Sequence, residues 1–150
     1  MKLFALLITI LLSVSCNGSR TEEFVTYVRS ADELFRQGKD EEAMNALVKA
    51  EKCYDDDIPS SALGSLKMRK GDIYYRYFDY AEAIGSYEEG AEIFLASGDT
   101  LNYCNALLLL CDASILNLDA SRAHKCISIM NENARFYHGQ SEHAYHLCRI

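Results

Sequence analysis

The sequence predicts an all-α fold, an α-solenoid of antiparallel helix pairs with a period of about 40 residues. Turn signals are scarce, because the 150 residues contain one proline, eight glycines and no tryptophan. A β-sandwich or barrel needs a turn about every 8–12 residues. Hydrophobic residues make up 49% of the chain, which is enough for a packed core. The third observation is that the chain repeats itself, and it decides the architecture.

Three segments align without gaps at one constant offset: LFRQGKDEEAMNALVKA from Leu34, YYRYFDYAEAIGSYEEG from Tyr74 and SILNLDASRAHKCISIM from Ser114. The matching columns are Ala43, Ala83 and Ala123; Leu47, Tyr87 and Ile127; Phe35, Tyr75 and Ile115; Ala31, Gly71 and Cys111; and Asp32, Asp72 and Asp112. Two helices approach closely only where one of them lacks a large side chain. We therefore interpret Gly71 and Ala83 as contact points between helices, and the nearby tyrosines as the side chains that pack over them.

The helices follow in order from this pattern. The first helix of each pair is predicted over residues 22–37, 61–77 and 100–117, and the second over residues 40–54, 80–96 and 119–135. Ser60 or Ser61, after Pro59, and Asp99 or Thr100 suit helix N-termini. Gly38, Gly98 and Gly139 mark short connections. The residues GQSEHAYHLCRI then read as the start of a fourth pair.

The first residues, MKLFALLITILLSVSC, have the character of an export signal. Lys2 precedes an apolar run that is too short to cross a bilayer, and small residues lead to Cys16. This stretch resembles the lipobox of bacterial lipoproteins, which implies that Cys16 is lipidated and becomes the first residue of the mature chain. The predicted organisation is a signal peptide over residues 1–15, a tether over 16–23 and helical repeats over 24–150. The alternative is a plain signal peptide with an incidental cysteine.

The repeat itself resembles the tetratricopeptide repeat. The second unit carries the likeness, with GDIYY in its first helix, YAEAIGSY in its second and Gly90 in the last small position. The period departs from that of the family, whose repeat has about 34 residues. The family's tryptophan and terminal proline are also absent. The six additional residues fall at IPSSAL, GDTLNY and HGQSEH, so we expect longer first helices.

The resemblance implies a concave face, lined by first helices, that holds a protein or peptide partner. Position by position, its residues would be Val25, Val28, Asp32, Phe35, Arg36, Met68, Asp72, Tyr75, Arg76, Asn105, Leu108, Asp112 and Ile115. Within this set, Asp32/Arg36 and Asp72/Arg76 lie four residues apart on a helix. One interpretation is that these charged residues bind a peptide backbone or a basic side chain of the partner. The other is that each pair is an ion pair within its own helix, worth about 0.2–0.5 kcal/mol.

Other chemistry has weaker support in the sequence. We interpret Cys53, Cys104, Cys111, Cys126 and Cys148 as buried free thiols, because they occupy helical positions that suit small apolar residues. His143 and His146, with His138 nearby, have a spacing of three that could place two metal ligands on one helix, but the sequence fixes no carboxylate or cysteine as a third ligand. No catalytic motif is present, so we expect neither an enzyme nor a cofactor or metal.

The predicted function is that of a lipid-anchored scaffold or binding module at the bacterial cell envelope, on the periplasmic side or the cell surface. A formal net charge of −7 argues against nucleic acid as a partner. The alternative is the extracytoplasmic sensory region of a longer signalling or transcriptional regulator, which the start of a fourth repeat favours. An enzyme or metal protein would rest on the histidines alone.

Overall fold

The computed structural model describes residues 20–137, with side chains as far as residue 132. The predicted lipidation residue Cys16, as well as Cys148 and the histidines His138, His143 and His146, lie outside the described part of the chain. The same is true of the connection predicted at Gly139.

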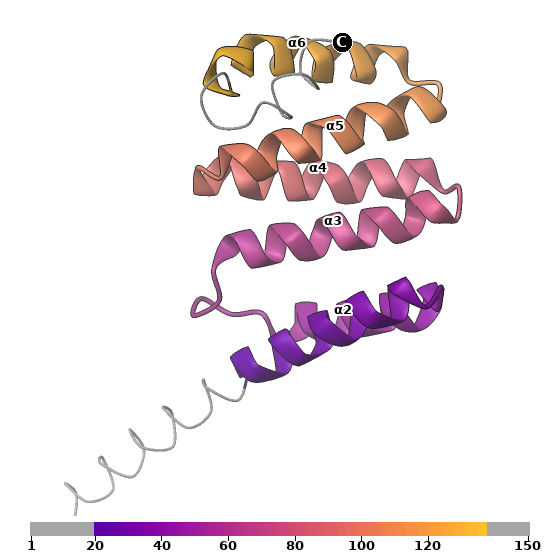
Figure 1. Cartoon of the computed structure of the whole chain (residues 1–150), viewed down its shortest axis with the longest axis vertical. Helices are drawn as coiled ribbons and strands as arrows, with labels where there is room; N and C mark the ends of the chain where they lie inside the picture. Colours follow the sequence, from indigo (N-terminus) through magenta and orange to yellow (C-terminus); the bar gives the residue numbers. More distant parts are fainter. Residues whose placement is uncertain (1–19, 138–150) are drawn as a thin grey trace, which may run out of the picture. The chain divides into compact units, whose positions relative to one another are not determined.

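Residues 20–137 form helices joined by short turns, and no strand occurs among them (Figure 1). A helix over residues 20–36 is followed by α2 (Asp40–Cys53), α3 (Ser60–Arg76), α4 (Tyr80–Ser97), α5 (Thr100–Leu116) and α6 (Ala120–Tyr137). The predicted all-α class is therefore confirmed. Each boundary lies close to its prediction, and the first helix begins at residue 20, two residues before its predicted start.

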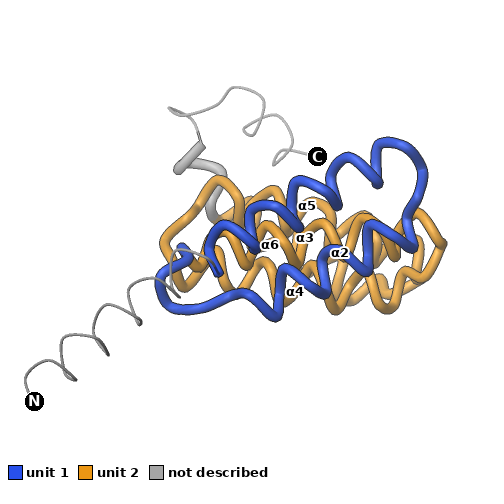
Figure 2. The backbone as a smooth tube through the Cα atoms, turned by 90° about the horizontal axis from the view of Figure 1, so that it is seen from below, with its two compact units in different colours: residues 1–59 blue, residues 60–150 orange. Residues whose placement is uncertain are grey.

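The chain divides into two compact units between Pro59 and Ser60 (Figure 2). In the first unit, the helix over residues 20–36 and α2 pack against each other along small residues. Ala31, Ala43 and Ala50 are buried, together with Phe24 and Leu47. At one end of this pair the rings of Phe24 and Tyr54 lie 6.3 Å apart. The burial of these alanines is compatible with the small-residue columns of the sequence.

In the second unit, each of the helices α3 to α6 contacts the next one along the chain. Helices α3 and α4 run antiparallel, and glycines line their contact. A Cβ atom on Gly64 would come 2.8 Å from the Phe94 ring, and one on Gly90 would come 2.7 Å from the Met68 sulfur. A Cβ atom on Gly71 would overlap the ring of Tyr87, which is 1% exposed. The predicted role of Gly71 as a contact point between helices is confirmed, Gly90 has the same role, and Ala83 is fully buried.

The turn inside each helix pair has the same backbone geometry. Gly38, Phe78 and Leu118, which occupy one column of the repeat, all have positive φ angles, of 73°, 63° and 59°. The following N–H group donates in each case to the carbonyl five residues earlier, at 2.9 Å from Lys39, 3.0 Å from Asp79 and 2.8 Å from Asp119. This pairing is the Schellman arrangement that ends a helix.

The start of the second helix also recurs, with one difference. The carboxylates of Asp79 and Asp119 accept hydrogen bonds from the N–H groups of Glu82 and Arg122, whereas Lys39 makes no such side-chain bond. Between α4 and α5, Gly98 has a φ of 72° and Asp99 caps α5 by accepting from the N–H group of Asn102. The predicted connection at Gly98 and the cap at Asp99 are confirmed.

Candidate functional site

The predicted binding residues of the first unit lie along the helix over residues 20–36. Val28, Asp32 and Phe35 are half-buried and Arg36 is exposed. The guanidinium of Arg36 lies 2.7 Å from the carboxylate of Glu33, one turn earlier. Sequence reasoning had considered only Asp32 as the partner of Arg36. Val25, which the same reasoning had also placed on this face, is exposed.

The predicted residues of α3 and α5 all belong to the second unit. On α3, Met68, Asp72 and Tyr75 are half-buried and Arg76 is exposed. The side chain of Met68 faces α4, since its sulfur is the atom that a Cβ on Gly90 would meet. Its contribution to a binding surface is therefore limited by its packing against α4.

On α5, Leu108 is half-buried against the core of the second unit, and Asn105, Asp112 and Ile115 are exposed. Leu108 therefore contributes to the packing between helices at least as much as to a binding surface. Asn105 and Asp112 present polar groups to solvent, and Ile115 presents an apolar one.

Two aspartates of the repeated column, Asp72 and Asp112, accept hydrogen bonds from tyrosines, which sequence reasoning had missed. The hydroxyl of Tyr87 on α4 donates to Asp72 at 2.9 Å. Burial raises the pKa of Asp72, while this hydrogen bond and the guanidinium groups of Arg69 and Arg76 act in the opposite direction. Burial, followed by the charge of Asp72 and the hydrogen bond to it, also raises the pKa of Tyr87. The Tyr87 hydroxyl therefore stays protonated and serves as a donor.

A second tyrosine joins α3 to α5. The hydroxyl of Tyr75 donates to the exposed carboxylate of Asp112 at 2.5 Å. This hydrogen bond, with smaller effects of burial and the charge of Asp112, raises the pKa of Tyr75 to about 12. The structure thus brings two of the predicted binding residues into direct contact, and both lie partly or fully open to solvent.

Next to this pair, the second unit carries an apolar surface that sequence reasoning did not find as a whole. We call it the turn-end surface and define it by Tyr75, Phe78, Tyr80, Asp112, Ile115 and Leu118. Its rings are in contact, with centroids 5.4 Å apart for Tyr75 and Tyr80 and 6.3 Å apart for Phe78 and Tyr80. The turns that hold Phe78 and Leu118 lie at the same end of the second unit (Figure 1).

Among the large hydrophobic residues of the described chain, Phe78 and Leu118 are the most exposed. The side chains of Phe78, Leu118 and Ile115 are 77%, 91% and 54% exposed. A signal for them was present in the sequence, because Phe78 and Leu118 occupy the column in which the first repeat has Gly38. Bulky apolar residues thus stand at a left-handed turn position that favours glycine.

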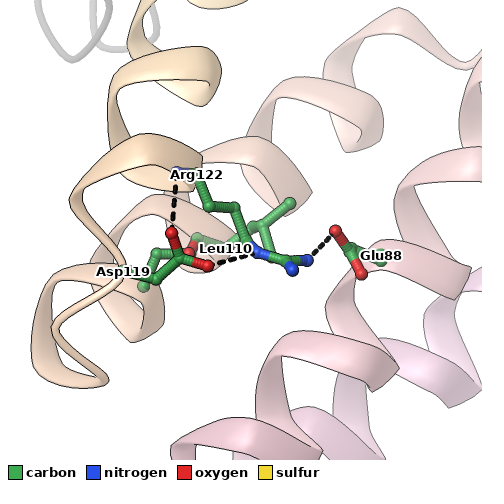
Figure 3. Close-up of polar contacts among 5 residues, drawn as sticks. Glu88, Leu110, Asp119 and Arg122 are labelled. Carbon is green, nitrogen blue, oxygen red and sulfur yellow. Dashed lines mark hydrogen bonds and ion pairs between the residues drawn. The ribbon is translucent and has the colours of Figure 1, made fainter.

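An ion-pair cluster joins α6 to α4 beside the core (Figure 3). The guanidinium of Arg122 contacts Glu88 on α4 and, through Nε, lies 3.0 Å from the carboxylate of Asp119. Hydrogen bonds from the backbone and side chain of Arg122 lower the pKa of Asp119. Each of the three charged groups is ion-paired within the cluster, so its geometry indicates a structural role.

The cysteines on α5 and α6 are buried, as predicted, whereas Cys53 on α2 is half-exposed. The Cys111 thiol lies 3.7 Å from the carbonyl oxygen of Ala123. Burial raises the pKa of Cys111, and it raises that of Cys126 to about 11. These thiols are therefore protonated at neutral pH, and the thiolate is the reactive form of cysteine.

Metal-binding clusters and membrane-spanning helices are both absent from the described part of the chain. Within it, no three His, Cys, Asp or Glu side chains converge in a way that could hold a metal ion. None of its helices is long and apolar enough to cross a membrane.

Comparisons with known proteins identify no relative of this chain. No family model matches the sequence. Neither a curated protein nor a solved structure is significantly similar to it.

Proposed function

We propose that this chain is a lipid-anchored α-solenoid of tetratricopeptide-like helix pairs that holds a protein or peptide partner at the bacterial cell envelope. The observation that carries the architecture is the recurrence of one turn geometry at the constant offset of the repeat. Gly38, Phe78 and Leu118 share the left-handed conformation. In each turn this residue donates its N–H group to the carbonyl three residues earlier, and the next residue donates to the carbonyl five residues earlier. The same helix ending also occurs at Gly98, between α4 and α5, so the support for a repeat comes from the constant offset of the three turns and not from their geometry alone.

Contacts between successive pairs support the same proposal. In a solenoid each unit contacts its neighbour, so first helices meet first helices and second helices meet second helices. The Tyr75–Asp112 hydrogen bond joins the first helices α3 and α5. The contact of Glu88 with Arg122 joins the second helices α4 and α6. Both kinds of contact are therefore present in the second unit.

Attachment to the envelope rests on the N-terminal sequence. An apolar run followed by SVSC is typical of a chain whose cysteine, here Cys16, is lipidated after export. Two or three acyl chains would hold the protein stably, because a single chain binds a membrane only marginally.

Binding rests on the exposed side of the first helices. In the second unit this side carries exposed polar groups at Arg76, Asn105 and Asp112 next to the half-buried ring of Tyr75. Aromatic rings with polar neighbours are common in protein interfaces. The proposed module binds without turnover, so it needs neither a cofactor nor a metal.

The test of attachment is the intact mass of the protein extracted from its native membranes. We expect the mass of residues 16–150 plus acyl chains. A plain signal peptide would leave a chain without acyl groups, which would contradict the proposed anchor. A much larger mass would instead favour the sensory region of a longer regulator.

The test of binding is photo-crosslinking in the native envelope. A crosslinking residue at Asn105 on α5 is expected to capture a partner protein or peptide. A matched residue at Lys125, which is also exposed but belongs to the second helix α6, is the control. Equal adducts at both positions, or none at either, would contradict binding along the first helices.

A further inference from the structure

The turn-end surface has the features of an anchoring site for a partner. The ring of Tyr80 contacts the rings of Tyr75 and Phe78, and the next helix pair carries the exposed apolar residues Ile115 and Leu118 at the same end of the second unit. The hydroxyl of Tyr75 holds the exposed carboxylate of Asp112 at the border of the rings. A carboxylate has about four acceptor positions, so one hydrogen bond leaves capacity for further donors.

The turn geometry gives no reason for these side chains. Glycine satisfies the left-handed conformation best, and Gly38 has it in the first repeat. Phe78 and Leu118 have the same conformation although their side chains are 77% and 91% exposed and bury little. The backbone is therefore strained at two positions to present apolar groups to solvent, and such strain is concentrated at functional sites.

Charge decides which kind of partner suits the surface. Asp79 directly follows the exposed Phe78, and the exposed carboxylate of Asp112 lies at the rings, whereas Asp119, which follows Leu118, is paired with Arg122. A lipid surface would require these carboxylates to approach the apolar phase, where charged groups are costly to place. A polypeptide with basic side chains meets the same carboxylates favourably, and its cations can also lie against the aromatic rings.

We propose that the turn-end surface binds a polypeptide segment in which apolar residues alternate with arginine or lysine. Apolar side chains of the segment pack on Phe78, Ile115 and Leu118. A basic side chain lies against the rings of Tyr75 and Tyr80 and pairs with Asp112. The inference rests on the proposed function. It specifies the chemistry of the partner and the end of the helices at which the partner binds.

The experiment measures binding of a short synthetic peptide of leucine, arginine and alanine to the mature protein in nonionic detergent. A peptide with glutamate in place of arginine is the matched probe. The main variant is Phe78→Gly combined with Leu118→Gly, because glycine suits both left-handed positions and loss of binding then cannot reflect unfolding. We expect the basic peptide to bind this variant at least about tenfold more weakly, since a few apolar anchors carry most of the affinity of an interface.

Two further variants complete the design. Asp112→Asn is expected to weaken binding of the basic peptide and to reduce its dependence on salt, because a charge pair is lost. Leu95→Ser is the control, since Leu95 is 59% exposed near the far end of α4. It should leave the affinity unchanged.

Several results would overturn the inference. The first is that the two peptides bind with equal affinity. The second is that Leu95→Ser loses as much binding as the glycine variant does. The third is that the glycine variant binds the basic peptide as tightly as the wild type. A lipid-docked surface would show itself as binding in detergent that disappears when the protein is reconstituted into phosphatidylcholine vesicles. If Asn105 still captures a partner while the glycine variant binds the basic peptide normally, only the inference fails. If no partner is captured at all, the proposed function fails.

Discussion

At the scale of single residues, Tyr87 shows how a large side chain fits between two closely packed helices. Its ring is almost fully buried over Gly71, where any side chain would overlap it. Its hydroxyl reaches the edge of the same contact and donates to Asp72. A single tyrosine thus packs its ring in the core and donates a hydrogen bond to a half-buried carboxylate.

Gly71 gives the first prediction. Gly71→Ala should lower the free energy of unfolding by about 1–3 kcal/mol, because the added methyl group forces the buried Tyr87 ring to move. This loss outweighs the gain of about 1 kcal/mol that alanine provides in a helix. The matched control is Gly85→Ala in α4, where a Cβ would meet nothing within 4 Å. It should raise stability, as measured by urea unfolding, and a similar response of both variants would contradict the packing.

Asp72 and Asp119 give a prediction on pH. Burial raises the pKa of Asp72 above its ordinary value of 3.8, so ionising it in the folded chain costs stability as the pH rises through that range. Hydrogen bonds from Arg122 lower the pKa of Asp119, so its ionised form stabilises the fold above 3.8 and this contribution is lost in acid.

The two asparagine variants should therefore change in opposite directions. As the pH rises from about 3 to about 7, the stability of Asp72→Asn relative to the wild type should increase, and that of Asp119→Asn should decrease. Urea unfolding across this range measures both differences. Parallel pH profiles of the two variants would show that the environments of the carboxylates have been misassigned.

At the scale of elements, the turn inside each helix pair is the most regular feature of the chain. Its backbone hydrogen bonds are the same in all three pairs, but its residues are not, because glycine occurs only at position 38. The conformation is therefore imposed by the helix ending and by the packing on either side of it. The residue at the turn is available for another purpose.

Leu118 tests this conclusion. Leu118→Gly should raise the free energy of unfolding by up to about 1 kcal/mol, because a left-handed non-glycine residue costs roughly 1–2 kcal/mol and glycine is more flexible when unfolded. Leu116→Gly, two residues earlier in α5, should lower stability by up to about 1 kcal/mol. Thermal unfolding compares the two variants. Destabilisation by Leu118→Gly would mean that the exposed leucine supports the fold after all.

At the scale of the whole molecule, the proposed anchor and the helical repeats make separate contributions. In the proposed function the helical repeats would hold the partner, and Cys16 would keep them at a membrane. Cys16→Ser should accumulate as an unacylated chain that retains residues 1–15, because the acyl acceptor is missing. Cys53→Ser, which alters a half-exposed thiol on α2, is the control and should be acylated and processed normally. Intact mass distinguishes the two, and acylation of Cys16→Ser would contradict the assignment.

Much of the candidate binding surface could be predicted only as positions along a helix. Asp72, Tyr75 and Asp112 were singled out because their columns recur, but their roles depend on partners from other helices. Tyr87 lies 15 residues from Asp72, and Asp112 lies 37 residues from Tyr75. Periodicity within a helix cannot specify such pairs, because they depend on how neighbouring helices pack.

The sequence by itself determined the helices, their boundaries and the small residues between them. These features depend on local preferences and on a repeated pattern of side-chain size, both of which are visible in the chain. Only the tertiary structure decided which groups those helices bring together. It directs the Tyr87 hydroxyl to Asp72, and it gathers Tyr75, Phe78 and Leu118 at one end of the second unit. The physical reason is that contacts across helices depend on packing distances and backbone conformation, which no single stretch of sequence encodes.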